Sequence, residues 1–308
     1  MRNAFVDRVI EDVKKNSDLF IITGDAGLGV FDKFKNEYPD NFLNMGVAEQ
    51  NATSFAAGMA ISGYKVYLYN IVPFLLYRPY EQVRNDICYQ DLPVTLVGIG
   101  SGITYAPQGM THYAIEDVAI ARTIPNLIVI SPIDPIEAEL AAEYSLVSKK
   151  PVYVRLAKRG EPNIHKNKNI DISKPILLKD GEDLGIIFHG SIGLEVMNAC
   201  YDLSKEGIFP KIISLPMLNP VNENEILNLI ANLKHLLTVE EHYITGGLGS
   251  ILSDLLIKNR CKINLVSAGI RYDFIHEIKN TDGMREFFGI SKTQLIKRVK
   301  EILKIKIN

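Results

Sequence analysis

The chain has 308 residues, of which 47% are hydrophobic and 23% are charged, and its formal net charge is −2. This balance is typical of a globular protein long enough for two domains, and the near-neutral charge argues against nucleic-acid binding. No apolar run reaches the roughly 20 residues that a membrane-spanning helix needs. The three cysteines form no CxxC pair, so we expect reduced thiols and a cytoplasmic protein.

The first half of the chain alternates between strand-like and helix-like patterns. Apolar residues at helical spacing predict an amphipathic helix over 1–16, which lacks the apolar centre of a signal peptide. The expected strands are 19–23, 66–69, 94–99, 127–130 and 151–156, and the expected helices are 48–62, 79–90, 114–123 and 134–148. Strands and helices in this alternation indicate βαβ units and a mostly parallel sheet.

The composition changes after residue 160. Residues 161–183 are polar and rich in Asn, Lys, Asp and Pro, which predicts a linker on the surface. A second α/β pattern follows, with strands expected at 184–188, 211–214 and 236–240 and helices at 192–206 and 248–259. We therefore expect an α/β protein with two doubly wound domains, one over 1–160 and one over 184–308.

Glu49 stands at the expected start of the helix over 48–62, between a Gly turn and a run of small residues. The small residues are Ala52, Ala56, Ala57, Gly58 and Ala60. Burying a carboxylate in such uncharged surroundings costs free energy, so the position indicates a function. The alternative is an ordinary acidic residue that the helix dipole favours at a helix start.

Four segments, in this order, resemble the C-terminal half of transketolase. They are GVAEQ, PFLLYRPYEQVRND, GMTHYAIEDVAIARTIPNLIVISPID and TVEEHYITGGLGS. The resemblance covers nearly the whole chain, from about Arg2 to the end. It implies a domain over 1–160 that binds the pyrimidine ring of thiamine diphosphate, a linker over 161–183 and a transketolase C-terminal domain over 184–308. The implied reaction is transfer of a two-carbon ketol unit between sugars.

The resemblance also implies which residues meet the cofactor. In transketolases a Glu at the place of Glu49 bonds to N1′ of the aminopyrimidine ring and favours its imino tautomer, a form of acid–base assistance. Phe74 and Tyr77 have the three-residue spacing of the rings that pack against the pyrimidine, with the aliphatic Ile71 as the first member of the series. The alternative is that these rings are ordinary core residues.

His112 follows a Gly-rich, irregular segment, where binding residues concentrate. The resemblance implies that it faces the reacting sugar, and an imidazole can bond to a hydroxyl group or move a proton. Gln108 stands where the family often has an Asp, so a neutral amide would contact the substrate there. A satisfied structural histidine is the alternative for His112.

The positions that hold a substrate phosphate differ from those of sugar-phosphate transketolases. Gly100 and Phe31 replace a His and a Ser of the family pattern. Arg2, Lys158 and Arg159 remain as candidate anion contacts, with solvated surface charges as the alternative. We therefore expect a substrate other than the usual pentose phosphates, such as a modified or nucleotide-linked sugar.

TVEEHYITGGLGS, residues 238–250, is similar to a segment of transketolase C-terminal domains. Its glycines, Gly246, Gly247 and Gly249, allow a tight turn from a strand into a helix. The segment matches neither a P-loop nor a dinucleotide-binding pattern. We expect a structural or interface role for it.

Transketolases also hold Mg²⁺ and the cofactor diphosphate with a GDG motif and a later Asn, since Mg²⁺ prefers carboxylate and phosphate oxygens. This chain has no such motif, because GDAGLG at 24–29 lacks the later Asn. We therefore expect no metal ligand here and a separate N-terminal transketolase-like subunit that supplies them in an α₂β₂ assembly. The chain alone should bind the cofactor poorly and be inactive.

Two other interpretations stay open from the sequence. One is a β subunit of a 2-oxoacid dehydrogenase or a part of a deoxyxylulose-phosphate synthase, which use the same cofactor. The segment THYAIEDVAIARTIPN fits transketolase and the synthase better than the dehydrogenase. The other is an α/β interaction or regulatory subunit without activity, against which Glu49, Phe74 and His112 count.

Overall fold

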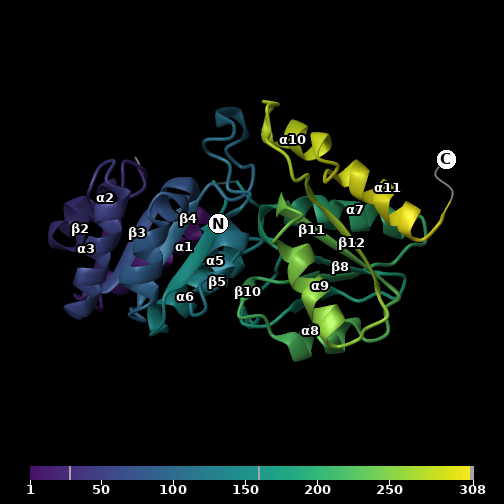
Figure 1. Cartoon of the computed structure of the whole chain (residues 1–308), viewed down its shortest axis with the longest axis horizontal. Coiled ribbons are helices and arrows are strands. Elements are labelled where there is room, and N and C mark those ends of the chain that lie inside the picture. The colour runs from purple at the N-terminus through teal and green to yellow at the C-terminus, as the bar shows by residue number, and fades with distance from the viewer. Residues whose placement is uncertain (28, 159, 306–308) are drawn as a thin grey trace.

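The computed structural model describes residues 1–27, 29–158 and 160–305, which form two α/β units side by side (Figure 1). Counted over these residues, the first unit has a seven-stranded sheet and the second a five-stranded sheet. Helices cover both faces of each sheet. The predicted α/β class with two doubly wound units is therefore confirmed.

The first sheet is parallel except at one edge. In sheet order its strands are β10 (Met217–Asn219), β5 (Ile128–Ile130), β6 (Val152–Leu156), β4 (Val94–Ile99), β3 (Lys65–Ile71), β1 (Leu19–Thr23) and β2 (Phe42–Asn44). Strand β10 runs antiparallel to β5. It comes from the second half of the sequence, so the two units share this sheet and are joined by more than the connecting segment.

The two faces of the first sheet are covered by different helices. These are α1 (Arg2–Val13) and α6 (Pro135–Val147) on one face, and α3 (Glu49–Ile61) and α5 (Asp117–Arg122) on the other. Along β1, Leu19 and Ile21 enter the core under α1 and α6, whereas Phe20 and Ile22 enter the core under α3. This alternation follows from the two-residue period of a strand. The alanines of α3 are buried and bring the helix close to the sheet.

The second sheet is also mostly parallel. In sheet order its strands are β12 (Asn264–Ile270), β11 (His235–Tyr243), β8 (Gly185–Phe188), β9 (Lys211–Ser214) and β7 (Ile176–Lys179). Its helices are α7 (Gly193–Lys205) and α11 (Lys292–Ile302) on one face, α8 (Glu223–Ile230) and α9 (Leu248–Lys258) on the other, and the short α10 (Thr281–Phe287) (Figure 1). No helix in the described part of the chain is both long enough and apolar enough to span a membrane.

The segment expected as a surface linker, 161–183, contains strand β7. Ile176 is buried while Lys179 is exposed, and the strand pairs antiparallel with β9 at the sheet edge. An edge strand buries only part of its surface. Because this strand also stands among polar residues, its sequence shows no clear hydrophobic pattern of a strand. A linker is therefore an incomplete description of this segment.

The predicted helix over 79–90 has a different form. A single α-helical turn, α4 (Tyr80–Gln82), lies between two π-helical segments, Pro73–Tyr77 and Val83–Cys88. Such wide turns are rare in proteins and frequently occur at functional sites. Phe74 and Tyr77, two of the predicted cofactor residues, lie in the first of these segments.

Candidate active site

Glu49 and Phe74 line the same small cavity on the first unit. Glu49 is the first residue of α3, and only 11% of its side chain is exposed. Phe74 lies in the π-helical segment that follows β3. The other residues that line the cavity are mostly apolar or small: Gly24, Ala52, Thr53, Leu68, Asn70, Leu75 and Pro79. The structure thus brings one carboxylate and one aromatic ring together at an apolar site.

Arg78 connects these two side chains. Its Nη1 donates a hydrogen bond to Oε1 of Glu49 at 3.0 Å, and its guanidinium carbon lies 4.2 Å from the centre of the Phe74 ring. The sequence analysis did not single out this arginine. A cation four residues after an aromatic residue in a helical segment is the pattern that could have indicated it.

His112 belongs to the same cluster of side chains. Its ring lies edge-on to Phe74, with 5.4 Å between the ring centres, and 6.1 Å from the ring of Tyr105. The segment that carries His112 is closed at its base by two hydrogen bonds between Gly102 and Ala114, at 3.0 and 2.9 Å. These bonds close the segment from which the half-buried imidazole contacts Phe74.

Tyr105 is a second site residue that sequence reasoning missed. Burial raises the pKa of its hydroxyl group, and the positive charge of Arg2 nearby opposes this rise. Lys158 Nζ lies 4.9 Å from the centre of the Tyr105 ring. Two of the predicted anion contacts are therefore near the His112 cluster, whereas Arg159 lies outside the described residues.

Aromatic rings fill the two positions where the family pattern has phosphate contacts. Gly100 has a φ of +86°, and a Cβ atom built there would overlap the Tyr105 ring. Phe31 is buried, with its ring edge-on to Tyr69 at 4.9 Å between centres. A histidine cannot replace Gly100 unless the Tyr105 ring moves.

Three predicted residues lie away from the cavity that Glu49 lines. The Tyr77 hydroxyl donates to Oε2 of Glu116 at 3.1 Å, and burial raises the pKa of this tyrosine well above its usual value. Ile71 is half-buried at the end of β3. Gln108 is exposed at the end of a short 3₁₀ turn. Their roles toward cofactor and substrate stay predictions.

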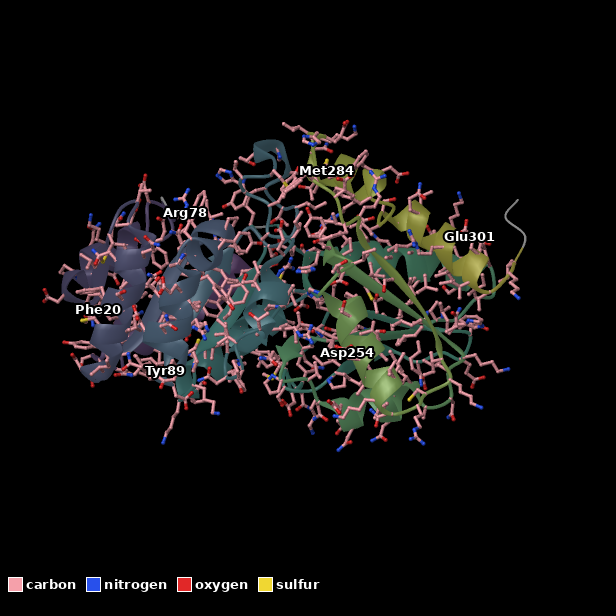
Figure 2. The ribbon with its side chains drawn as sticks, in the orientation of Figure 1. Phe20, Arg78, Tyr89, Asp254, Met284 and Glu301 are labelled. Carbon is pink, nitrogen blue, oxygen red and sulfur yellow. The ribbon has the colours of Figure 1, made fainter. Side chains whose placement is uncertain are left out.

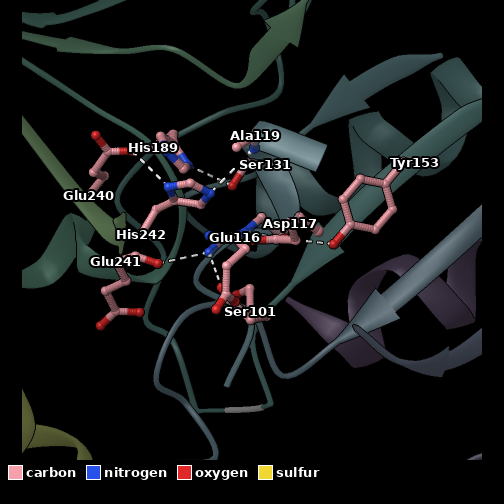
Figure 3. A network of polar contacts seen from close by, with 12 residues as sticks. Ser101, Glu116, Asp117, Ala119, Ser131, Tyr153, His189, Glu240, Glu241 and His242 are labelled. Carbon is pink, nitrogen blue, oxygen red and sulfur yellow. Dashed lines mark hydrogen bonds and ion pairs between the residues drawn. The ribbon is translucent and has the colours of Figure 1, made fainter. Parts of the chain in front are cut away.

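The TVEEH segment lies on β11 at the junction of the two units (Figure 3). Glu240 accepts two backbone N–H groups in the first turn of α9, at 2.7 and 3.1 Å. Glu241 accepts a hydrogen bond from Arg285 Nε at 2.7 Å. His242 Nε2 accepts the N–H group of Ala119 in α5 at 3.4 Å. The segment therefore has the structural and interface role that its glycines and missing phosphate pattern predicted.

The buried Arg155 connects Ala114, where the segment that carries His112 ends, with strand β11. Arg155 Nε donates to Oδ2 of Asp117 at 2.6 Å, and its Nη2 donates to the carbonyl oxygens of Ala114 and Glu241, both at 2.8 Å. Tyr153 also donates to Asp117, at 2.7 Å. Because the pair is fully buried and bonded on several sides, it fixes the geometry of the junction.

His189, a residue of the second unit, contacts the first unit at the same junction. Its Nδ1 lies 2.8 Å from the Ser131 hydroxyl, and its Nε2 lies 3.7 Å from Oε2 of Glu240. Burial lowers the pKa of His189 to about 3, and burial raises the pKa of Glu240. The imidazole is therefore neutral near pH 7.

Comparison with known proteins identifies the family of this chain. The pyrimidine-binding domain of transketolase matches residues 1–162, and the transketolase C-terminal domain matches residues 174–294.

The chain belongs to the transketolase family.

Relatives include proteins that are named as transketolase subunits. The chain is 30% identical over 298 residues to one of the subunits of the apulose-4-phosphate transketolase of Actinobacillus succinogenes, with 96% of each chain covered. It is 29% identical to the 6-deoxy-6-sulfo-D-fructose transketolase subunit SqwH of Clostridium sp. strain MSTE9, over 98% of this chain and 94% of that protein. Several deoxyxylulose-phosphate synthases match it over less than half of their own length.

One solved structure matches this chain over nearly the full length of both chains. A split-gene transketolase, described as an inactive β₄ tetramer, has a TM-score of 0.86 and 26% sequence identity, and the match covers 99% of this chain and 98% of that chain. This chain thus matches the C-terminal part of transketolase over nearly its full length, as its four motifs predicted.

Membership of the transketolase family implies dependence on thiamine diphosphate. The residues of the small cavity fit the aminopyrimidine part of that cofactor. Glu49 offers a carboxyl group for a ring nitrogen, and Phe74 offers a flat face for a flat heterocycle. Among residues 1–27, 29–158 and 160–305, no cluster of three or more His, Cys, Asp and Glu side chains is placed to hold a metal ion.

Proposed function

We propose that this chain supplies the pyrimidine side of a thiamine diphosphate site, and that a separate N-terminal transketolase subunit supplies the diphosphate side with its Mg²⁺. The observation that carries the proposal is the convergence of Glu49 and Phe74 in one cavity at the start of α3. The names of the relatives, which include individual transketolase subunits and a split-gene transketolase, support the division of the site between two chains. An α₂β₂ assembly would place each cofactor between unlike subunits.

Glu49 and Phe74 would hold the cofactor ring in the orientation that the reaction needs. Thiamine diphosphate, when bound, supplies the carbon atom that accepts the two-carbon unit from one sugar and passes it to another. Glu49 would bond to N1′ of the aminopyrimidine ring, and Phe74 would pack against the face of that ring. The mostly apolar lining of the cavity lowers the polarity around this contact, and a hydrogen bond is stronger in such surroundings.

His112 and its neighbours would contact the sugar. The imidazole lies beside Phe74, so it is placed to bond to a substrate hydroxyl group or to move a proton at that atom. Lys158 and Arg2, near Tyr105, offer positive charge for an anionic group on the substrate. Gln108 is exposed between Tyr105 and His112 in the sequence, and its amide would contact a substrate hydroxyl group.

We propose a modified, anionic ketose as the donor or acceptor. Tyr105 occupies the space beside Gly100, where the family pattern has a phosphate-binding histidine. The two relatives named above act, by their names, on apulose 4-phosphate and on 6-deoxy-6-sulfo-D-fructose, which both carry an anionic group. A deoxyxylulose-phosphate synthase activity is the alternative, because several such synthases are 27–31% identical to this chain.

The substrate proposal is tested by turnover assays on this chain mixed with its N-terminal subunit. Modified anionic ketoses should be turned over faster than xylulose 5-phosphate with ribose 5-phosphate, and the chain alone should be inactive. Rapid turnover of the two pentose phosphates would contradict the substrate proposal. Full activity without a partner would contradict the split site.

A further inference from the structure

Arg78 makes two contacts at once, and both are with residues of the proposed pyrimidine site. Its guanidinium donates to Glu49 at 3.0 Å and lies over the Phe74 ring, 4.2 Å from the ring centre. Arg78 directly follows the π-helical segment that carries Phe74 and lies at the edge of the first unit (Figure 2). About half of its side chain, 48%, is exposed, compared with 11% for Glu49.

A guanidinium group and an aminopyrimidine ring have similar shapes and bonding needs. Both are flat, both pack on an aromatic face, and both form a hydrogen bond in their own plane to a carboxyl group. Arg78 therefore makes with Glu49 and Phe74 the same two contacts that the cofactor ring would make. The two groups exclude each other when they use the same carboxylate oxygen and the same ring face.

We propose that Arg78 is an internal competitor for the pyrimidine subsite, an inference that rests on the proposed function. In the chain without cofactor, its guanidinium holds Glu49 and covers Phe74. Thiamine diphosphate binds when the guanidinium leaves both residues. The side chain is half-exposed, and in the described part of the chain its guanidinium has no hydrogen-bond partner besides Glu49. It can therefore move into water by breaking only its contacts with Glu49 and Phe74.

The size of the competition follows from the two contacts that are lost. Partly exposed ion pairs and cation–π contacts are each weak, and together they correspond to a change in cofactor affinity of roughly 3- to 30-fold. Competition of this size would contribute to the poor cofactor binding expected for the chain alone.

The first test measures cofactor affinity by titration calorimetry, with thiamine diphosphate and Mg²⁺ added to the complex of the full chain and its N-terminal subunit. Arg78→Gln should lower the Kd by roughly 3- to 30-fold. Arg84→Gln is the matched control, because Arg84 is an exposed arginine of the neighbouring π-helical segment that bonds only to its own neighbour Asn85 in the described residues. It should leave the Kd unchanged.

Glu49→Ala in the same titration separates the two proposals. If Arg78→Gln binds the cofactor no more tightly than the natural chain while Glu49→Ala binds more weakly, competition by Arg78 is refuted and the proposed function stands. If Glu49→Ala leaves binding unchanged, or if no variant binds thiamine diphosphate, the proposed function itself fails and the inference fails with it.

The second test needs no partner and no cofactor. Urea unfolding of the full chain is compared for Glu49→Gln, Arg78→Gln and the double variant. If the pair forms in the free chain, the effects on the unfolding equilibrium constant should deviate from additivity by roughly two- to fivefold. Additive effects would mean that Arg78 does not hold Glu49 in solution, and would overturn the inference.

Discussion

At the scale of single residues, the site is a carboxyl group set in apolar surroundings. Glu49 begins α3, so its backbone is fixed by the helix while its side chain faces the cavity that Phe74 lines. A carboxyl group held in this way loses little freedom when it bonds to a ligand, which is the physical basis of preorganisation. Its main contact in the free chain is with a half-exposed arginine that can leave.

Glu49→Ala should abolish turnover in the reconstituted enzyme. Loss of the bond to the cofactor ring should lower kcat by roughly 10²- to 10⁴-fold, the range of acid–base assistance. Steady-state assays give this loss, and size-exclusion chromatography with the partner subunit gives the control, because assembly should be intact. A variant that keeps full turnover would contradict the role of Glu49.

Residue-level reasoning from the sequence found Glu49, Phe74 and His112, and the structure places them together. It missed Arg78, although an arginine four residues after Phe74 is a local pattern, and it missed Tyr105, whose contact with Lys158 joins segments that are distant in the sequence. Tyr105 reaches His112 and Lys158 only through the folded segment that follows β4.

At the scale of elements, most strands and helices follow from hydrophobic periodicity. The predicted strands 19–23, 94–99 and 211–214 match β1, β4 and β9 residue for residue. The strands β2, β7, β10 and β12 were not predicted, and all four lie at the edges of the two sheets, where a strand buries only part of its surface. The π-helical turns around Phe74 were also not predicted, since they depend on tertiary packing rather than on a local pattern.

A substitution of Gly100 tests how closely the side chains pack in the segment after β4. Gly100→Ala should lower the free energy of unfolding by about 2–4 kcal/mol, because the residue has positive φ and its Cβ would overlap the Tyr105 ring. Gly46→Ala is the control, since Gly46 has a φ of +66° with no atom within 4 Å of a Cβ, so only about 1 kcal/mol of backbone strain is expected.

Urea unfolding of the two glycine variants measures this difference. Tyr105→Ala should restore part of the stability of Gly100→Ala, because it removes the ring that causes the overlap. Equal losses in the two glycine variants would show that the Tyr105 ring does not fill this space.

At the scale of the whole molecule, the two units are joined by buried polar contacts rather than by a flexible tether. Arg155, Glu241 and His242 connect β6 and α5 of the first unit with β11 of the second, and β10 adds a strand across the junction. Removing one member of such a network leaves its partners buried without bonds, which is costly. The junction therefore fixes the second unit relative to the segment that carries His112.

The junction should also make stability depend on pH through His189. Its pKa is about 3 in the folded chain and 6.5 in its ordinary state, so the unfolded chain binds an extra proton between these values. This contribution is fully present above pH 6.5 and is lost as the pH falls below it, at up to about 1.4 kcal/mol per pH unit.

His189→Gln should flatten this dependence. Urea unfolding at pH values of about 7.5, 6 and 5 gives the free energy of unfolding for both proteins, and the difference between them should shrink as the pH falls. Other buried groups, such as Glu240 and His242, are present in both proteins and largely cancel in the difference. A constant difference over this range would contradict a neutral, buried His189.

The most direct test of the account is a crystal structure of this chain with its N-terminal subunit, thiamine diphosphate and Mg²⁺. We predict that Glu49 lies within hydrogen-bond distance of N1′ of the aminopyrimidine ring, that Phe74 packs on the ring, and that Arg78 has moved away from both. A structure in which Glu49 stays bonded to Arg78 while the ring lies elsewhere would contradict the central claim that this chain holds the pyrimidine half of the cofactor.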